Sequence, residues 1–134
     1  MGTTLHLRPV ALVVDDDDQS SEVLRRFLVA EGFAVVSSMS AEDAMLVAPK
    51  HRFDLILLDI QMYGMNGWQF LDQLHVRDMQ SKVPVIITSG RPIEDDVVQK
   101  RGAVAALQKP IRLVELKAIL ARLGLPRAGG APAA

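Results

Sequence analysis

Carboxylates follow two apolar stretches of this chain. Four consecutive aspartates, residues 15–18, come directly after the apolar run Val10–Val14, and Asp59 follows the run Leu55–Leu58. Adjacent carboxylates repel one another unless a cation or solvent relieves them, and their hard oxygens suit Mg²⁺ or Mn²⁺. An aspartate run is also a common solvated loop, and a single Asp after a strand is often a turn former or helix cap. The acidic residues alone leave both interpretations open.

A hydroxyl and an ammonium group follow two later apolar runs. Ser89 comes shortly after Val83–Ile87, and Lys109 comes shortly after Val104–Leu107. Each has an ordinary explanation, because a serine can begin a turn and a lysine before Pro110 can simply be solvated. Beside carboxylates, however, these groups are the equipment that stabilises a phosphoryl group on a carboxylate nucleophile. The set therefore indicates phosphoryl chemistry, although no single member does.

Short apolar runs of this kind must be strands rather than helices. They are too short to be free-standing helices, and β-branched residues dominate several of them. Because they are apolar on both faces, they predict a parallel sheet covered by helices on both sides. The predicted strands are Val10–Val14, Phe33–Val36, Leu55–Leu58, Val83–Ile87 and Val104–Leu107.

Segments of helical period separate these strands. The predicted helices lie at about 19–31, 40–48, from 67 past 74, 94–101 and 113–123, and most end at a glycine or, for the second, at Pro49. A strand and helix repeated five times predicts right-handed crossovers and an open, doubly wound α/β sheet. Such sheets bind ligands at the carboxyl ends of their strands, which brings Asp15, Asp16 and Asp59 to one edge.

Composition predicts one soluble globular domain. The 134 residues are 49% hydrophobic with a net charge of −1, and no basic run marks a nucleic-acid reader. Cysteine is absent, which excludes disulfides, thiolate metal sites and thiol catalysis. No apolar run approaches the roughly 20 residues of a membrane span, and no signal peptide is evident, so we expect a cytoplasmic protein. We expect an extension at 1–9, the domain at 10–124 and a disordered Ala, Gly and Pro tail at 125–134.

Five segments carry a resemblance to a known family. They are Ala11–Val14 with the following Asp15-Asp16, Asp54–Asp59, Met62–Gly67, Pro84–Gly90 and Lys109-Pro110. Asp59 and Ser89 are also thirty residues apart. In these features the chain, from Val10 to about Leu123, resembles the receiver domains of two-component response regulators. The resemblance implies a flavodoxin-like (βα)5 fold with strand order 2-1-3-4-5.

The resemblance also implies roles for six residues. Asp59 would be the phosphoacceptor, Asp15 and Asp16 would bind Mg²⁺ (or Mn²⁺), and Gln61 would offer its backbone carbonyl to the metal. Ser89 would bond a phosphoryl oxygen, and Lys109 would pair first with the carboxylate of Asp59 and then with the phosphoryl group. The Lys109-Pro110 peptide is typically cis in such domains.

Two positions depart from the family's pattern. Receiver domains usually carry a switching aromatic residue three places before the lysine, where this chain has Ala106. A methyl group cannot swing between exposed and buried poses, so coupling cannot use an aromatic rotamer here. Tyr63 replaces the usual proline of the loop after the phosphoacceptor, which predicts altered metal access or partner contact. Gln61 and Arg91 should flank the mouth of the pocket.

The function expected from these observations is signalling by phosphoryl transfer. The donor would be a histidine kinase or a histidine phosphotransfer protein, and the downstream protein is unknown. The resemblance implies that a homodimer, if formed, would use the fourth helix, fifth strand and fifth helix, although Ala106 weakens this expectation. One alternative is a receiver-like binding module that switches little, which Ala106 favours. Another is a phosphatase of the haloacid-dehalogenase type, but those need an Asp two residues after the nucleophile, where this chain has Gln61.

Overall fold

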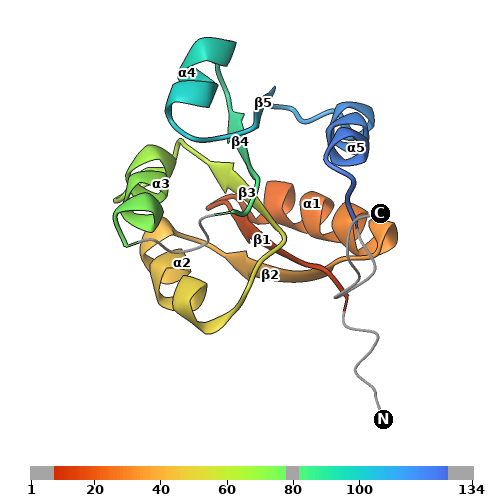
Figure 1. Ribbon diagram of the computed structural model, residues 1–134, viewed down its shortest axis with the longest axis horizontal. Helices are drawn as coiled ribbons and strands as arrows, with labels where there is room; N and C mark the ends of the chain where they lie inside the picture. Colours follow the sequence, from red (N-terminus) through yellow and green to blue (C-terminus); the bar gives the residue numbers. More distant parts are fainter. Residues whose placement is uncertain (1–7, 78–81, 127–134) are drawn as a thin grey trace.

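The computed structural model describes residues 8–77 and 82–126, which form a five-stranded parallel sheet between helices (Figure 1). The strands are β1 (Val10–Val14), β2 (Ala34–Ser38), β3 (Leu55–Asp59), β4 (Val85–Ser89) and β5 (Ala105–Gln108). The helices are α1 (Asp18–Glu31), α2 (Ala41–Val47), α3 (Gly67–Val76), α4 (Asp95–Lys100) and α5 (Leu113–Arg122), with a 3-10 turn, η2 (Ala48–Lys50), after α2. The strand order β2-β1-β3-β4-β5 confirms the predicted doubly wound α/β fold.

Alternate residues of the central strands enter two separate cores. Ile56 and Leu58 of β3 pack with α2, α3 and α4, whereas Leu55 and Leu57 pack with α1 and α5. Figure 1 shows the same division of helices between the two faces of the sheet. All of β3 is buried, because helices cover both of its faces, as its continuous apolar run predicted. The edge strands β2 and β5 are buried only in part.

The predicted ends of the edge-proximal strands need correction. β2 begins one residue later than predicted, β4 two residues later and β5 one residue later, and each continues further toward the carboxyl edge. Main-chain pairing with the neighbouring strand sets these ends, rather than the apolar run. Val14 pairs with Ser38, and Ser89 pairs with Gln108, although three of these four residues are polar. Consequently Ser89 is itself the last residue of β4.

Local capping explains where the helices begin and end. Asp17 caps α1 by accepting the N–H groups of Gln19 and Ser20, and Asn66 caps α3 in a capping box with Gln69. The second helix was predicted to reach residue 48, but α2 ends one residue earlier. The chain then tightens into η2 with Pro49 inside it, because a proline is tolerated in the first turn of a helix.

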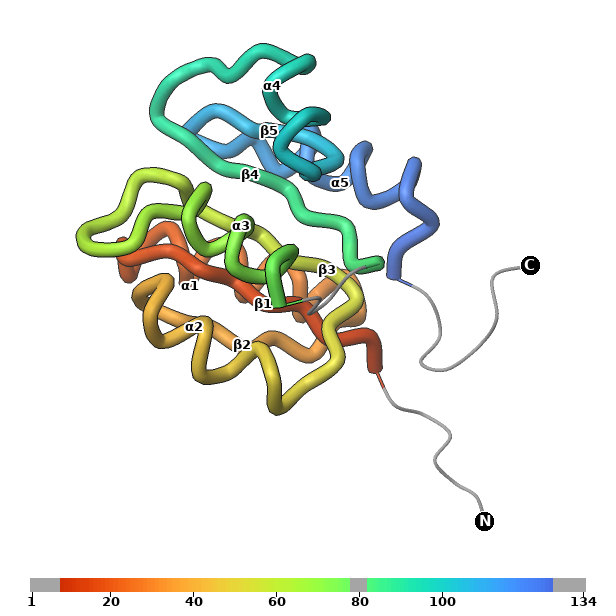
Figure 2. Tube along the Cα trace, turned by 60° about the vertical axis from the view of Figure 1, so that its left-hand side comes forward, coloured from red at the N-terminus to blue at the C-terminus, as the bar shows by residue number. Residues whose placement is uncertain are grey.

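Both described ends of the chain lie at the amino edge of the sheet, away from the acidic residues (Figure 2). The Pro9 carbonyl accepts the Ala34 N–H, which ties the predicted extension to β2. Leu125 packs against the core formed with α1 and α5, although it was predicted to lie in the tail. Residues 1–7 and 127–134 of the predicted extension and tail lie outside the described residues. Within the described residues no helix combines the length and apolarity needed to cross a membrane.

Candidate functional site

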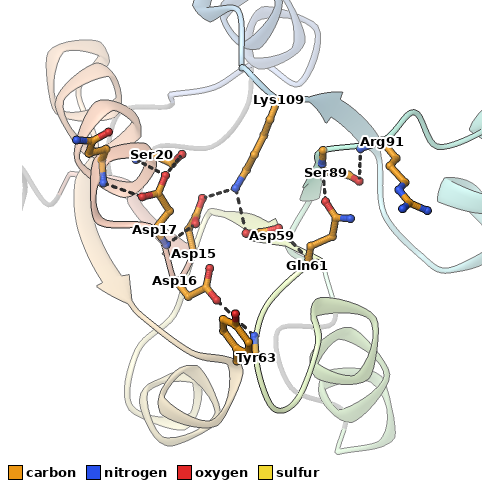
Figure 3. A network of polar contacts seen from close by, with 12 residues as sticks. Asp15, Asp16, Asp17, Ser20, Asp59, Gln61, Tyr63, Ser89, Arg91 and Lys109 are labelled. Atoms are coloured by element: carbon orange, nitrogen blue, oxygen red, sulfur yellow. Dashed lines mark hydrogen bonds and ion pairs between the residues drawn. The ribbon is translucent and has the colours of Figure 1, made fainter.

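Four predicted site residues lie at the carboxyl edge of the sheet, each at the end of a different strand. Asp15 follows β1, Asp59 ends β3, Ser89 ends β4 and Lys109 follows β5. Since β1 and β3 are neighbours, their terminal acidic residues meet at the point where the chain order of the sheet reverses. Figure 3 shows Lys109 reaching from β5 into the space between the two aspartates.

The carboxylates of Asp15, Asp16 and Asp59 form one cluster. One oxygen from each side chain lies within 4.8 Å of the others. Asp15 and Asp59 are only 1% and 2% exposed, whereas Asp16 is half-buried. Three carboxylate oxygens converging at this spacing are a hard donor set, so the chemistry of the cluster fits a divalent cation such as Mg²⁺ or Mn²⁺.

Lys109 is shared between the two buried carboxylates. Its Nζ lies 3.0 Å from Oδ2 of Asp59 and 3.2 Å from Oδ2 of Asp15. The main-chain N–H of Lys109 donates to the Ser89 carbonyl at 2.7 Å, which fixes the base of the side chain against β4. The Lys109-Pro110 peptide is cis, as the resemblance implied. The ammonium therefore neutralises only part of the negative charge gathered here.

The second oxygen of each buried carboxylate is held by the main chain. Asp15 Oδ1 accepts the Asp17 N–H at 2.9 Å, and Asp59 Oδ1 accepts the Gln61 N–H at 2.9 Å. Both carboxylates are therefore fixed in the same manner, with Oδ1 on a backbone donor and Oδ2 toward the lysine. A carboxylate held in this way is already oriented for reaction, which lowers the entropic part of a barrier.

Burial and charge act in opposite directions on the ionisation of this cluster. Burial raises the pKa of Asp15 above its ordinary value, although the Asp17 N–H and the Lys109 ammonium favour its charged form. Burial also opposes the charge of Lys109, but its hydrogen bond to Asp59 and the nearby Asp15 carboxylate prevail and raise the pKa of Lys109. The lysine therefore stays charged at neutral pH, while the excess of carboxylates favours an additional cation.

Ser89 and Gln61 line the side of the site opposite Asp15, and Arg91 follows Ser89 on the same loop (Figure 3). Ser89 Oγ accepts the Arg91 N–H at 3.0 Å, so the hydroxyl is engaged by its own loop. The Gln61 side chain crosses to the same loop, where its Oε1 accepts the Gly90 N–H at 2.6 Å. The side chain of Gln61 was predicted only to flank the mouth of the pocket, and this bridge was not foreseen. The side chain of Arg91 points away from Asp59 in Figure 3.

The loop between β3 and α3 is held over the acidic residues by two carboxylates. The Tyr63 N–H donates to Asp16 Oδ2 at 3.3 Å, and the Met65 N–H donates to Glu42 Oε2 at 2.8 Å. Tyr63 as a residue is 93% exposed, so its side chain does not fill the pocket. A proline at position 63 would have no N–H, so the departure from the family's pattern supplies the bond to Asp16.

Ala106 packs against the core on β5 and lines a groove of about 470 Å³ between α4, β5 and α5. The walls of the groove include Val98 and Gln99 on α4 and Ile119 on α5. The groove is therefore open beside Ala106, the residue that stands where the family usually has a switching aromatic side chain.

Sequence reasoning missed two residues that shape the site. Glu42 lies on α2, and its contact with residue 65 spans 23 positions, so no local pattern indicates it. Gly67 begins α3 directly against the end of β3, where an added Cβ would lie 2.5 Å from the Asp59 carbonyl oxygen. In the sequence, the presence of a glycine at position 67, the last residue of the segment Met62–Gly67, was the one sign of this close approach.

Comparison with known proteins identifies the family. A family model described as the response regulator receiver domain matches residues 11–121. The transcriptional regulatory protein PrrA of Mycobacterium tuberculosis is 38% identical over 122 residues, or 87% of this chain and 52% of that protein. The two-component response regulator ARR14 of Arabidopsis thaliana is 34% identical over 110 residues, or 81% of this chain and 29% of that protein. The chain thus spans about half or less of the length of these curated relatives.

Solved structures agree with the fold. The chemotaxis protein CheY4 of Vibrio cholerae superposes with a TM-score of 0.78 at 24% identity, covering 85% of this chain and 97% of that one. The response regulator TrrA of Thermotoga maritima, in complex with Mg(2+)-BeF, gives 0.75 at 23% identity, covering 86% and 98%. At these identities the structural likeness establishes the fold alone. Family membership rests on the family model, which matches residues 11–121 and so covers most of the chain. The chain belongs to the receiver domain family of two-component response regulators.

Proposed function

We propose that Asp59 accepts a phosphoryl group from a phosphohistidine donor in the presence of Mg²⁺, and that the chain signals by protein-protein contact or phosphorelay. The observation that carries the proposal is the Lys109 ammonium, bound to Asp59 and Asp15 at the centre of a three-carboxylate cluster. Transfer of a phosphoryl group to a carboxylate requires a nucleophile, a cation beside it and ligands for a metal ion.

The transfer exchanges one bond to phosphorus for another. A carboxylate oxygen of Asp59 forms the new O–P bond while the N–P bond of the donor breaks, and the electron pair remains on the imidazole nitrogen. The donor is already reactive, so the barrier consists mainly of positioning and charge repulsion. Lys109 offsets the repulsion between the carboxylate and the phosphoryl oxygens, and the Gln61 N–H holds the Asp59 side chain in place. After transfer, Ser89 supplies a hydroxyl to the phosphoryl group.

The proposed metal ligands are the side chains of Asp15, Asp16 and Asp59 and the backbone carbonyl of Gln61. When bound, Mg²⁺ would supply positive charge that offsets the negative charge on the phosphoryl oxygens during transfer. The excess of carboxylates over ammonium groups in the cluster supports this assignment. Asp16 is the least buried of the three, which leaves the cluster open to solvent on that side.

The proposed donor is a histidine kinase or a histidine phosphotransfer protein in the cytoplasm. PrrA and ARR14 are named as a transcriptional regulatory protein and a two-component response regulator, which supports such a donor for this chain. The chain matches only part of each relative, so its downstream partner belongs to the proposal as well. A homodimer through α4, β5 and α5 would bury the groove beside Ala106.

The test is intact-mass spectrometry after incubation with acetyl phosphate or phosphoramidate, with and without Mg²⁺. We expect a Mg²⁺-dependent gain of about 80 Da in the wild type. Asp59→Asn should abolish the gain, and Asp18→Asn, which changes an exposed carboxylate outside the cluster, should retain it. The proposal fails if the folded wild type gains no mass and also binds no beryllofluoride, which mimics the phosphoryl group.

A receiver-like binding module that switches little is the second candidate. Ala106 favours it, because a methyl group on β5 cannot change pose in response to Ser89. The two candidates differ in the response of the protein rather than in its chemistry. A module of this kind would bind a partner equally well with and without beryllofluoride, whereas a signalling domain would change its affinity.

A further inference from the structure

We propose that the Gln61 side chain is a latch that restrains the loop between β4 and α4 and slows capture of the phosphoryl group. The latch is the hydrogen bond from the Gly90 N–H to Gln61 Oε1. This inference rests on the proposed phosphoacceptor function of Asp59 and concerns the regulation of that same site.

The latch joins two loops that belong to different strands. The distance from the Gly90 nitrogen to Gln61 Oε1 is 2.6 Å, and the two residues are 29 positions apart in the sequence. Figure 3 shows the Gln61 side chain leaving the end of β3 and reaching the end of β4 beside Ser89. Because β3 and β4 are adjacent in the sheet, one extended amide side chain suffices to span them.

Gln61 is connected to both the acceptor and the loop. Its main-chain N–H donates to Asp59 Oδ1, while its side chain accepts from Gly90. The next residue of that loop, Arg91, donates its N–H to Ser89 Oγ. At its start the loop is therefore held by a hydrogen bond from outside, through Gln61, and by one within itself, through Ser89, while Ile93 further along packs against the core.

The chemistry of the latch opposes an incoming phosphoryl group. A phosphoryl group carries anionic oxygens that need hydrogen-bond donors, and the Gly90 N–H stands next to the hydroxyl of Ser89. In the latched state that N–H is occupied, and the atom presented beside it is Oε1 of Gln61, an acceptor that repels anionic oxygen. Opening the latch frees one donor and removes one acceptor, so both changes favour the phosphorylated state.

Gly90 allows the latch to be opened from the other side. An added Cβ at position 90 would lie 2.9 Å from Gln61 Oε1, and apart from its two chain neighbours only Gln61 atoms of the described residues lie within 4 Å of it. The backbone of Gly90 is not in the left-handed region, so alanine is compatible with its conformation. Gly90→Ala would therefore push away the flexible end of Gln61 without disturbing the main chain, whereas Gln61→Met removes the acceptor at nearly constant length.

The experiment measures the rate of Mg²⁺-dependent phosphorylation by phosphoramidate, and the affinity for beryllofluoride, in four proteins. They are the wild type, Gln61→Met, Gly90→Ala and the double variant, with Gln73→Met on α3 as the matched control. Loss of one hydrogen bond should raise both quantities about 2- to 10-fold in either single variant. The double variant should gain no more than the larger single effect, because both changes break the same bond. The control should match the wild type.

A spectroscopic readout separates the latch from a general loosening of the fold. In Gln61→Met the Gly90 amide proton should shift and exchange faster with solvent, while amides of β3 and β4 keep their protection. Single variants that react at or below the wild-type rate, or gains that add in the double variant, would overturn the latch and leave the phosphoacceptor function standing. A wild type that neither gains phosphoryl mass nor binds beryllofluoride would overturn both.

Discussion

Lys109 shares one ammonium group between two buried carboxylates, and Asp16 adds a third negative charge beside them. The cluster is therefore a source of instability in the metal-free protein, because like charges held at close range in a buried site are costly. Asp15 shows this most directly, since burial raises its pKa above the ordinary value of 3.8. Residues kept for reaction rather than for stability are expected to carry such a cost.

Asp15→Asn should raise the free energy of unfolding of the metal-free protein at pH 7, and its Tm with it. A folded-state pKa above the unfolded value means that the folded protein prefers the protonated acid. The cost of the carboxylate is therefore full above the raised pKa and disappears as pH falls below 3.8. The gain from asparagine should follow the same course and vanish in acid.

Thermal unfolding across pH 3 to 7 measures this effect, with Asp18→Asn as the control. Asp18 lies in the same aspartate run but is exposed and outside the cluster, so its asparagine variant should gain nothing. Added Mg²⁺ should raise the Tm of the wild type and leave that of Asp15→Asn nearly unchanged. A destabilised Asp15→Asn protein at pH 7 would show that the contact of Asp15 with Lys109 outweighs the repulsion.

Lys109→Gln should have the opposite effect. The lysine is 24% exposed and is the cation bound to both Oδ2 atoms, so its loss leaves buried carboxylates facing one another. We expect a loss of about 1–3 kcal/mol in the free energy of unfolding without metal, measured by urea denaturation. Saturating Mg²⁺ should recover part of this loss. Lys117→Gln on α5, a largely exposed lysine, should change the stability little.

At the scale of elements, the junction between β3 and α3 positions Asp59, the proposed phosphoacceptor. Gly67 starts α3 where an added Cβ would meet the Asp59 carbonyl oxygen at 2.5 Å and the Ile60 Cα at 2.6 Å, both main-chain atoms. Gly67→Ala must therefore push the helix away from the end of the strand. We expect a loss of about 2–4 kcal/mol in the free energy of unfolding and slower phosphorylation of Asp59.

Gly124→Ala is the matched control for this substitution. Gly124 has φ +71° and nothing within 4 Å of an added Cβ, so alanine there meets backbone strain alone, worth about 1 kcal/mol. Chemical denaturation of the two variants separates a clash from a conformational penalty. Equal losses in both would mean that α3 absorbs the added methyl group without moving.

The elements were predictable to the extent that local pattern determines them. The run Leu55–Leu58 is apolar on both faces, which was sufficient to predict a central parallel strand with Asp59 at its end. The end of β2 at Ser38 depends on pairing with β1, which no run of apolar residues records. The bonds of Gln61 to Gly90 and of Glu42 to Met65 depend on how loops from separate elements meet. Strand ends and loop contacts of this kind are long-range results of the fold.

At the scale of the whole molecule, the open question is how a change at Asp59 reaches a distant surface. Ala106 has no side chain to rotate, so β5 cannot relay the change in the usual way. Helix α4 follows the loop that the Gln61 latch restrains, and Arg101, the residue that caps its C-terminus, contacts α3. The Arg101 guanidinium lies 4.6 Å from the Trp68 ring centroid and 3.3 Å from Asp72 Oδ2. These two contacts link the C-terminal end of α4 to α3, so a shift of α4 would change them.

The fluorescence of Trp68 should report on that connection. Trp68 is the single tryptophan of the chain, and a cation over an indole ring contributes about 0.5–1 kcal/mol at an exposed site. If release of the loop shifts α4, the guanidinium moves relative to the ring, and the emission of Trp68 changes when beryllofluoride and Mg²⁺ bind.

Arg101→Ala should remove most of this change while leaving the affinity for beryllofluoride within about twofold of the wild type, because the helix contact lies outside the acidic cluster. Arg112→Ala, which alters an exposed arginine before α5, should respond as the wild type does. A silent Trp68 in the wild type, or an unchanged response in Arg101→Ala, would show that α4 keeps its place against α3 and that the signal leaves the site by another surface.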